Sequence, residues 1–336
     1  MPATEVLVVD PSAPDVRRIA RAAACLRAGG LVAFPTETVY GLGAHALDPV
    51  AVGRIFTAKG RPASDPLIVH VASLEELAPL VSRVPATVVS LARRFWPGPL
   101  TMVLPRHAIV PDAVTAGLGS VAVRVPAHSI ARALLIEAGI PVAAPSANLF
   151  SRPSPTLASH VLDDLDGRID MILDGGSTDV GVESTVIDLT GNIAVVLRPG
   201  AVSVEALREV LGEVEVRETA QQAETGMPMT SPGLLSKHYS PRAPLTLYEG
   251  PPHAALDRLH ADARAAEAEG RTVGVLDFGG GQAPGTIAAR LYGALRDLDD
   301  ERPDLILVRG CDTDEGLGRA IQDRLRRAAA GRVIRA

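Results

Sequence analysis

The stretch DVRRIARAAACLRAGGLVAFP, residues 15–35, decides the fold class, because it joins an amphipathic helix to a buried strand. Its apolar positions recur at helical spacing: Val16, Ile19, Ala20, Ala23 and Leu26. Gly29 and Gly30 end the predicted helix, and the apolar run at 31–35 then predicts a strand. Short apolar runs alternate with longer amphipathic stretches along the whole chain, which is typical of an α/β protein.

The same alternation predicts a first domain over residues 1–212. Asp48 and Pro49 form an N-cap and first-turn pair that begins a helix over 49–58. Further helices are predicted at 74–81, 86–95, 130–138 and 204–211. Strands are predicted at 66–71, 100–105 and 121–126, and three more between Met171 and Gly200. Residues 140–148 run from a strand into a polar loop.

Residues 213–243 differ from the rest, because they are polar, rich in Pro, Thr and Gln, and lack periodicity. We interpret them as a linker or active-site lid. The remainder, 244–336, predicts a smaller Rossmann-like α/β domain with three strands. Its helices are expected at 253–269, 285–298 and 313–330.

The composition limits the class of protein. The formal net charge of −6 argues against a protein that coats nucleic acid nonspecifically. Cys25 and Cys311 lie far apart, so neither a disulfide framework nor a zinc site is expected. No apolar run approaches the length of a membrane span, and the N-terminus lacks the features of a signal peptide. We therefore expect a soluble cytoplasmic protein with no membrane contact.

Lysine is almost absent: of 33 basic residues only Lys59 and Lys237 are lysines. A lysine retained against this bias, in a loop punctuated by Gly and Pro, favours a functional role over a generic surface charge. Chance placement is the alternative, and for Lys237 the two interpretations are equally good.

Several strand-to-loop junctions carry groups that bind phosphate. Lys59 and Arg61 flank Gly60, which has no side chain. Two cations beside an unobstructed backbone are suited to binding a polyphosphate. Ser146 and Asn148 follow a predicted strand, at the edge where α/β proteins bind ligands. Taken singly, Ser146, Asn148 and Ser184 fit ordinary turn and cap chemistry better than a ligand site.

Two arginines and a serine complete this set. Ser184 and Arg198 also stand at strand ends, whereas Arg124 lies in an apolar strand and needs an anionic partner. That partner is either a substrate or one of the 39 acidic residues of the chain. The histidines and Glu37 fit structural roles as well. Together these groups predict a site for a nucleoside triphosphate and a small anionic substrate.

Other nucleotide and hydrolase motifs are absent from the sequence, which holds no Walker P-loop, no G-x-S-x-G elbow and no H-E-x-x-H helix. DFGGGQAPG, residues 277–285, follows a predicted strand but misses the dinucleotide-binding register, because Pro284 stands where a glycine is needed. We interpret it as a loop.

Eight motifs in order resemble the YrdC-type threonylcarbamoyl-AMP synthases over about residues 14–210. They are FPTETVYGLGA (34–44), AKGRP (58–62), PLIVHV (66–71), WPGPLT (96–101), VAVRVP (121–126), APSANLFSRPSPT (144–156), VGVESTVIDL (180–189) and LRPGAV (197–202). The later SPGLLSKHYSP (231–241) and the C-terminal α/β region resemble the long, two-domain form of that enzyme. The resemblance implies an open, strongly twisted α/β sheet with a concave cationic cleft.

The resemblance also implies a reaction. L-threonine and bicarbonate or CO2 give an N-carboxylated threonine, which attacks the α-phosphate of ATP to form threonylcarbamoyl-AMP and pyrophosphate. A separate transferase then modifies tRNA. Mg²⁺ is the implied cofactor, held mainly by phosphates and water rather than by protein ligands.

The family pattern assigns roles to particular residues. It implies charge neutralisation by Lys59 and Arg61. It implies ATP contacts at Lys59, Arg61, Asp65, Ser120, Ser146, Asn148, Ser154, Arg198 and Tyr239. It implies threonine contacts at Thr38, His70, Arg124, Ala144 and Ser184, with a two-pronged ion pair between Arg124 and the substrate carboxylate.

The chain departs from the family pattern at four positions. Leu235 and Ser236 replace a basic residue and a tyrosine in the lid, Asp65 stands where Asn is common, and Ser120 where Thr is common. Two alternatives remain open. A noncatalytic module with weak RNA contacts is one, and a carbamoyl-adenylate enzyme is the other, although no acylphosphatase-like or zinc-finger region is visible.

Overall fold

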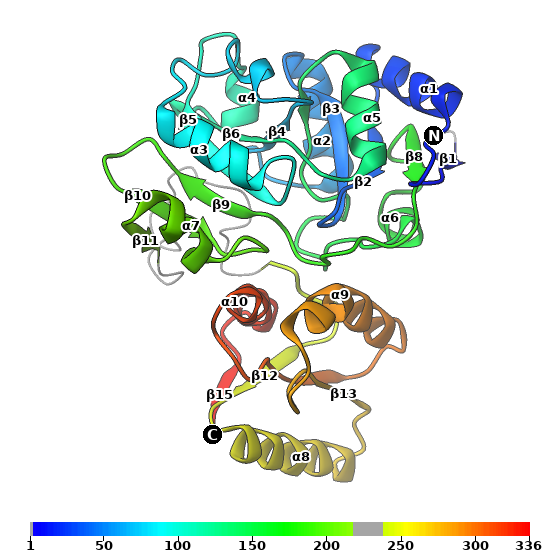
Figure 1. Ribbon diagram of the computed structural model, residues 1–336. Coiled ribbons are helices and arrows are strands. Elements are labelled where there is room, and N and C mark those ends of the chain that lie inside the picture. Colours follow the sequence, from blue (N-terminus) through cyan, green and yellow to red (C-terminus); the bar gives the residue numbers. More distant parts are fainter. Residues whose placement is uncertain (1–2, 218–237) are drawn as a thin grey trace.

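A computed structural model describes residues 3–217 and 238–336, and it holds two sheets that belong to separate parts of the chain (Figure 1). The larger sheet lies in the N-terminal part and the smaller one in the C-terminal part. The α/β fold class is confirmed for both. The predicted lid positions Leu235 and Ser236, together with Lys237, lie outside the described residues.

The larger sheet is mixed and has 11 strands. In spatial order they are β1 (Glu5–Val8), β8 (Met171–Asp174), β2 (Val32–Pro35), β3 (Tyr40–His45), β7 (Val142–Ala143), β4 (Ile68–His70), β6 (Ser120–Arg124), β5 (Leu100–Pro105), β9 (Thr185–Asp188), β10 (Ala194–Arg198) and β11 (Val214–Val216). The strands β4 and β6 are parallel and end together at His70 and Arg124. This pairing brings two predicted site residues to one edge of the sheet.

Helices cover the large sheet. They are α1 (Val16–Arg27), α2 (Pro49–Lys59), α3 (Ala86–Phe95), α4 (Asp112–Thr115), α5 (Ser129–Ala138), α6 (Ala158–Leu165) and α7 (Val204–Leu211). The predicted capping is confirmed: the Asp48 side chain accepts hydrogen bonds from Val50 N and Ala51 N at the start of α2. Gly60 ends α2 in the left-handed conformation, with φ 64°. Lys59 is therefore the last residue of the helix, and Arg61 leaves it through a tight turn.

Two predicted boundaries differ from the structure. Residues 74–81, predicted to form an α-helix, hold only a short 3₁₀ helix, η1 (Glu75–Leu77). β11 pairs in parallel with β10, so the predicted linker begins with a strand of the large sheet. The exact domain limits at 212 and 243 stay predictions.

The smaller sheet is fully parallel, in the order β13 (Val273–Asp277), β14 (Leu305–Arg309), β12 (Leu245–Glu249) and β15 (Val333–Arg335). The prediction of three strands is wrong, because β15 at the chain end adds a fourth. Its helices are α8 (Pro252–Ala268), α9 (Pro284–Asp300) and α10 (Leu317–Ala329). α9 and α10 lie on the face toward the large unit, and α8 covers the opposite face (Figure 1).

The two parts share one apolar core. Val39 and Val182, from loops of the larger part, pack in the same buried cluster as Leu245, Tyr292 and Ile321 of the smaller part. Burial of this apolar surface holds the two parts together. The loops that carry Val39 and Val182 also border the candidate site, so the interface and the site are contiguous.

Two further findings concern the sequence predictions. Cys25 and Cys311 are both free thiols, in agreement with the expected absence of a disulfide. Within residues 3–217 and 238–336, no helix is long and apolar enough to cross a membrane.

Candidate active site

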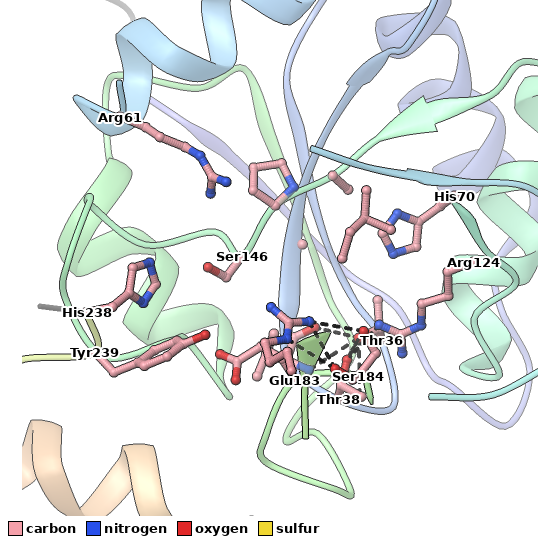
Figure 2. A pocket seen from close by; sticks show the side chains of 16 residues that line it. Thr36, Thr38, Arg61, His70, Arg124, Ser146, Glu183, Ser184, His238 and Tyr239 are labelled. Carbon is pink, nitrogen blue, oxygen red and sulfur yellow. Dashed lines mark hydrogen bonds between the residues drawn. The ribbon is translucent and has the colours of Figure 1, made fainter. Parts of the chain in front are cut away.

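A pocket opens at the ends of β4 and β6, between the large sheet and the segment that leads into the smaller unit. Its lining residues are Thr36, Thr38, Val39, Gly41, Arg61, Ile68, His70, Arg124, Ala144, Pro145, Ser146, Glu183, Ser184, Arg198, His238 and Tyr239. Figure 2 shows Arg61, His238 and Tyr239 on one side, His70 and Arg124 on the other, and Ser146 between them. The pocket is therefore two-sided, with a guanidinium on each side.

Arg61 supplies the cation of the first side. Its guanidinium is buried, forms an ion pair of 2.9 Å with Asp65, and donates to the carbonyl of Pro66 at 2.8 Å. The Nε atom of Arg61 has no hydrogen-bond partner among the described residues, although it is shielded from solvent. A buried donor without a partner is costly unless a ligand accepts from it. Asp65 thus points to Arg61 and offsets part of its charge.

Lys59 lies behind this side and not in the pocket wall. Its ammonium donates to the carbonyls of Ser146 and Asn148, both at 2.5 Å, and so fastens the loop that carries Ser146. Burial, with the charge of Arg61, lowers the pKa of Lys59 well below its ordinary value. Lys59 therefore does not line the pocket, because its ammonium is bound by backbone carbonyls, and its predicted contact with ATP stays a prediction.

The floor of the pocket is built on β9 and β10. Arg198 donates to the carbonyl of Ser184 through Nε at 3.2 Å and through Nη2 at 3.0 Å. Nη2 also contacts the Ser184 hydroxyl at 3.2 Å, and that hydroxyl lies 2.8 Å from the hydroxyl of Thr101. These contacts fix Ser184 and Arg198 as one buried unit facing the cavity.

Arg124 supplies the cation of the second side. It forms an ion pair of 2.7 Å with Glu37, donates to the Thr38 hydroxyl at 3.1 Å, and donates through Nε to the Gly98 carbonyl at 3.3 Å. An internal acid thus satisfies Arg124, as the structural alternative predicted, and yet the guanidinium faces the pocket. Since a guanidinium has more N–H donors than these contacts use, it retains the capacity to bind a carboxylate beside Glu37.

Gly98, in the WPGPLT motif, makes the Arg124 contact possible. A Cβ atom at this position would lie 2.3 Å from the Phe95 carbonyl oxygen, so only glycine fits. Its backbone N–H donates to Val125 O at 2.8 Å, which ties the motif to the end of β6. The motif therefore acts on the pocket through Arg124 and, at Thr101, through Ser184, without lining it.

His70 is a neutral group on the second side. Burial and the charge of Arg124 lower its pKa to about 3. Its Nδ1 atom is buried and has no hydrogen-bond partner within the described part of the chain. A neutral imidazole beside Thr38 and Arg124 offers a hydrogen bond to a ligand without adding charge.

His238 and Tyr239 close the first side. The His238 ring lies 4.0 Å from the Tyr239 ring, edge to face, and 6.0 Å from that of Phe150. Tyr239 is buried and has a positive φ of 61°, which is uncommon for a tyrosine. Burial raises the pKa of Tyr239, so its hydroxyl stays protonated. The described end of the predicted linker or lid therefore contributes a wall of the pocket.

The structure brings together most of the predicted site residues. Those lining the pocket are Thr38, Arg61, His70, Arg124, Ala144, Ser146, Ser184, Arg198 and Tyr239. Asn148 and Ser154 lie one layer behind: the Asn148 amide donates to Leu149 O and Arg152 O, and the Ser154 hydroxyl donates to Glu183 at 2.5 Å.

Ser120 is not part of this assembly. It begins β6, whereas Arg124 ends that strand, and it lines a separate surface hollow with Pro105 and Asp188. The two residues are four positions apart, and an extended strand rises about 3.3 Å per residue, so the strand length separates them.

Sequence reasoning missed three groups in the wall, namely Thr36, Glu183 and His238. Each is a sequence neighbour of a predicted residue: Thr36 in PTET, Glu183 before Ser184, and His238 before Tyr239. Proximity to a predicted site residue was the available signal. It could not show that Glu183 would be a buried carboxylate rather than a surface charge.

The fold and the pocket define a two-domain α/β protein with a buried, two-sided cationic site for anionic ligands. Two family models match the chain. One, described as "Telomere recombination", matches residues 24–200, and the other, described as "Threonylcarbamoyl-AMP synthase, C-terminal domain", matches residues 202–330. The chain belongs to the threonylcarbamoyl-AMP synthase family, in its two-domain form.

Curated relatives agree with this assignment. The chain is 46% identical over 327 residues to the threonylcarbamoyl-AMP synthase of Pyrococcus abyssi, covering 95% of this chain and 96% of that protein. It is 45% identical over 348 residues to the Bacillus subtilis protein of the same name, covering 98% and 97%. A shorter relative of that name, from Halorhodospira halophila, is 39% identical over 158 residues, which are 47% of this chain and 83% of that protein.

A solved structure confirms the fold. The crystal structure of P. abyssi Sua5 complexed with L-threonine is 44% identical, covers 99% of this chain and 100% of its own, and has a TM-score of 0.95. The predicted open, twisted YrdC-like sheet followed by a smaller α/β domain is thus confirmed.

Proposed function

We propose that this protein is a threonylcarbamoyl-AMP synthase, a nucleotidyltransferase that converts ATP, L-threonine and bicarbonate or CO2 into threonylcarbamoyl-AMP and pyrophosphate. The names of its full-length relatives support the proposal, as does the threonine complex of the related P. abyssi protein. The observation that carries it is the pocket with Arg61 on one side, Arg124 on the other and Ser146 between them.

The two sides suit two substrates. We assign the triphosphate to the side of Arg61, Arg198 and Tyr239, with Lys59 acting through the Ser146 loop. We assign threonine to the side of Thr38, His70 and Arg124, bordered by Ala144 and Ser184. Placing the two anions on opposite sides of Ser146 lets their reacting ends meet in the middle of the pocket, which is the main catalytic requirement of such a transfer.

The reaction then needs positioning more than a covalent nucleophile. The threonine amine takes up CO2 and loses a proton to become a carbamate, and a carbamate oxygen attacks the α-phosphorus of ATP. The bond between that phosphorus and the bridging oxygen to the β-phosphorus breaks, and pyrophosphate leaves with the bonding electrons. The fixed cations Arg61 and Arg198 stabilise the charge that develops on the leaving group.

Mg²⁺ is part of the proposal as a companion of ATP. Among the described residues, no group of three histidine, cysteine, aspartate or glutamate side chains could hold a metal. The nearest carboxylates, Glu183 and Asp65, already pair with Arg324 and Arg61. This donor set fits an ion carried by phosphates and water. When bound, Mg²⁺ supplies further neutralisation of phosphate charge.

A product such as threonylcarbamoyl-AMP is a mixed anhydride and hydrolyses readily, so a closed pocket protects it. We propose that a separate transferase consumes it in tRNA modification.

The decisive experiment measures pyrophosphate release with each substrate omitted in turn. We expect release only with ATP, L-threonine and bicarbonate together, and a threonylcarbamoyl-AMP mass in the product. The control replaces L-threonine by D-threonine, which presents the same groups in the wrong geometry. Pyrophosphate release that ignores threonine, or RNA binding without any release, would overturn the proposal.

The depressed pKa of Lys59 leads to a second prediction. A triphosphate near the Ser146 loop favours the ammonium and raises the pKa of Lys59, so the protein takes up a proton on ATP binding at any pH above the depressed pKa of the free protein and below the pKa of the complex. We expect calorimetry with a non-hydrolysable ATP analogue to give a binding enthalpy that changes with buffer ionisation enthalpy. Affinity for the analogue should fall as pH rises through the depressed pKa of the free protein.

The matched control for this measurement is Lys59→Met, which keeps the length of the side chain. Proton uptake should disappear in that variant. Uptake that persists unchanged without Lys59 contradicts the assignment of the titrating group.

A further inference from the structure

Glu183 is the meeting point of the two domains at the pocket. Its carboxylate accepts the Ser154 hydroxyl at 2.5 Å and the Tyr292 hydroxyl at 2.9 Å, and it pairs with Nε of Arg324 at 2.7 Å. Ser154 belongs to the first domain, whereas Tyr292 and Arg324 come from α9 and α10 of the second. Glu183 lines the pocket and directly precedes Ser184 in the floor.

Arg324 is almost fully buried, with only 1% of its surface exposed. Besides Glu183, it pairs with Asp323 at 2.7 Å and donates to the carbonyl of Pro199 at 3.0 Å. Pro199 follows Arg198, so Arg324 touches the first domain at both β-strand ends of the pocket floor. A buried guanidinium with this many partners is geometrically fixed.

The same guanidinium supports the aromatic wall. Its Cζ atom lies 5.4 Å from the centre of the Tyr239 ring, and the ring of Tyr292 lies 5.5 Å from that of Tyr239. The positive φ of Tyr239 needs such support, because surrounding contacts must stabilise an uncommon backbone conformation. Arg324 and Tyr292 therefore set the position of Tyr239 from the side away from the pocket.

The loop before Glu183 is pressed against the second domain. A Cβ at Gly181, where φ is 77°, would lie 2.2 Å from the Ala288 carbonyl of α9, so the two backbones are in direct contact. Val182 adds its side chain to the second domain's core. The strand-end loop that carries Glu183 and Ser184 thus rests on α9 and α10.

We propose that Arg324 of the second domain is a positioning residue for the reaction in the first domain, holding Glu183 and Tyr239 so that Ser154, Ser184 and the aromatic wall are set for the substrates. The inference rests on the proposed function and gives the second domain a part in it. Arg324 touches no substrate in this scheme. It acts through Glu183 and Tyr239, because it restricts the groups that contact the substrates to one position.

The charge balance around Glu183 gives the proposal a measurable signature. Burial opposes ionisation of Glu183, but the guanidinium groups of Arg324 and Arg198 and the Ser154 hydrogen bond outweigh it and keep the pKa below the ordinary value. The other titratable groups facing this carboxylate are the hydroxyls of Tyr239 and Tyr292. Without Arg324, the pKa of Glu183 rises, and protonation weakens its contacts at a higher pH.

The test uses full-length Arg324→Met in steady-state pyrophosphate release. We expect kcat/KM for ATP to fall by about tenfold or more, since misplacing supporting groups by a small distance has effects of this order. The acid limb of its pH–rate profile should move to higher pH. The affinity for L-threonine alone should fall by less than kcat/KM for ATP does, because among the described residues Arg324 contacts neither Thr38 nor His70 and reaches the threonine side only through Glu183 and Ser184.

Arg326→Met is the matched control. It lies on the same helix and pairs with Glu249 at 2.6 Å, but its side chain is 54% exposed and does not line the pocket. We expect wild-type kinetics, because exposed ion pairs contribute little. Arg324→Lys keeps the positive charge but lacks the planar guanidinium. Compared with Arg324→Met, we expect its pH–rate profile to return closer to that of the wild type than its kcat/KM does.

Removing one partner of a buried ion pair can prevent folding. The double variant Arg324→Met/Glu183→Gln removes both charges of this ion pair, while Asp323 keeps its ion pair with Arg327. Tyr292→Phe removes only the hydroxyl that donates to Glu183. The double variant should fold and remain impaired, and Tyr292→Phe should lower kcat/KM for ATP by about two- to fivefold.

A folded Arg324→Met or double variant with wild-type kcat/KM and pH profile overturns the inference. If neither variant folds, a Tyr292→Phe variant with the wild-type kcat/KM for ATP overturns the inference. A wild-type protein that makes no product at all counts against the proposed function, and the positioning role falls with it.

Discussion

An Arg61→Ala variant is expected to lose at least about 100-fold in kcat, with a larger effect on kcat than on threonine affinity. Arg61 is the pocket-lining cation of the proposed triphosphate side, and its buried Nε has no partner among the described residues. The pyrophosphate leaving group gains charge in the transition state, so a fixed guanidinium stabilises that state more than the bound substrate. Single-turnover pyrophosphate release separates the chemical step from binding.

The variant needs a control for folding, because Asp65 is buried and would lose its ion-pair partner. Arg61→Ala/Asp65→Asn leaves no unpaired charge, and Asn is common at this position in the family that the sequence resembles. The double variant should fold as the wild type does and remain inactive. Near wild-type turnover in either variant contradicts the assignment of charge neutralisation to Arg61.

Lys59→Ala is also expected to abolish product formation, but for a different reason from the one that the sequence indicated. Its ammonium holds the carbonyls of Ser146 and Asn148. Removing it leaves two buried acceptors unpaired and frees the loop. The measured difference between the Arg61 and Lys59 variants would show whether direct or loop-mediated stabilisation dominates.

An Arg124→Met variant should lose threonine binding, by about 50-fold or more, while it retains affinity for an ATP analogue. The prediction follows from the position of Arg124 on the side of the pocket opposite Arg61 and from its remaining donor capacity beside Glu37. Calorimetric titration with L-threonine and with the analogue measures both affinities on the same protein.

Glu37 provides the control for this variant. Arg124→Met alone leaves a buried carboxylate unpaired, whereas Arg124→Met/Glu37→Gln does not. If the double variant folds and binds threonine as tightly as the wild type, Arg124 serves the fold alone, and the substrate carboxylate is bound elsewhere.

Much of the fold was predictable from local sequence, because its determinants lie close together in the chain. Asp48, Pro49 and Gly60 mark both ends of α2, and the apolar run at 31–35 contains β2. The order of the eight motifs pointed to the family. Both domains and the position of Tyr239 at the pocket followed from that resemblance.

The roles of individual side chains were less predictable. Lys59 and Arg61 are two positions apart and both basic, yet only Arg61 lines the pocket, because Lys59 still belongs to the last turn of α2. Ser120 and Arg124 share β6, but only Arg124 is at the end that reaches the site. A strand or helix end can be predicted from sequence, but the direction of each side chain depends on what packs against it.

The sequence by itself determined the family, the α/β class and the set of cations from which a polyanion site could be built, since these depend on residue type and order. The tertiary structure decided how those charges are used. It paired Arg124 with Glu37 and Arg61 with Asp65, and it brought Arg324 from the far end of the chain to Glu183. Buried ion pairs form only between groups that the folded chain brings together away from water. Arg324 and Glu183 are 141 positions apart in the sequence, so only the three-dimensional structure shows that they are paired.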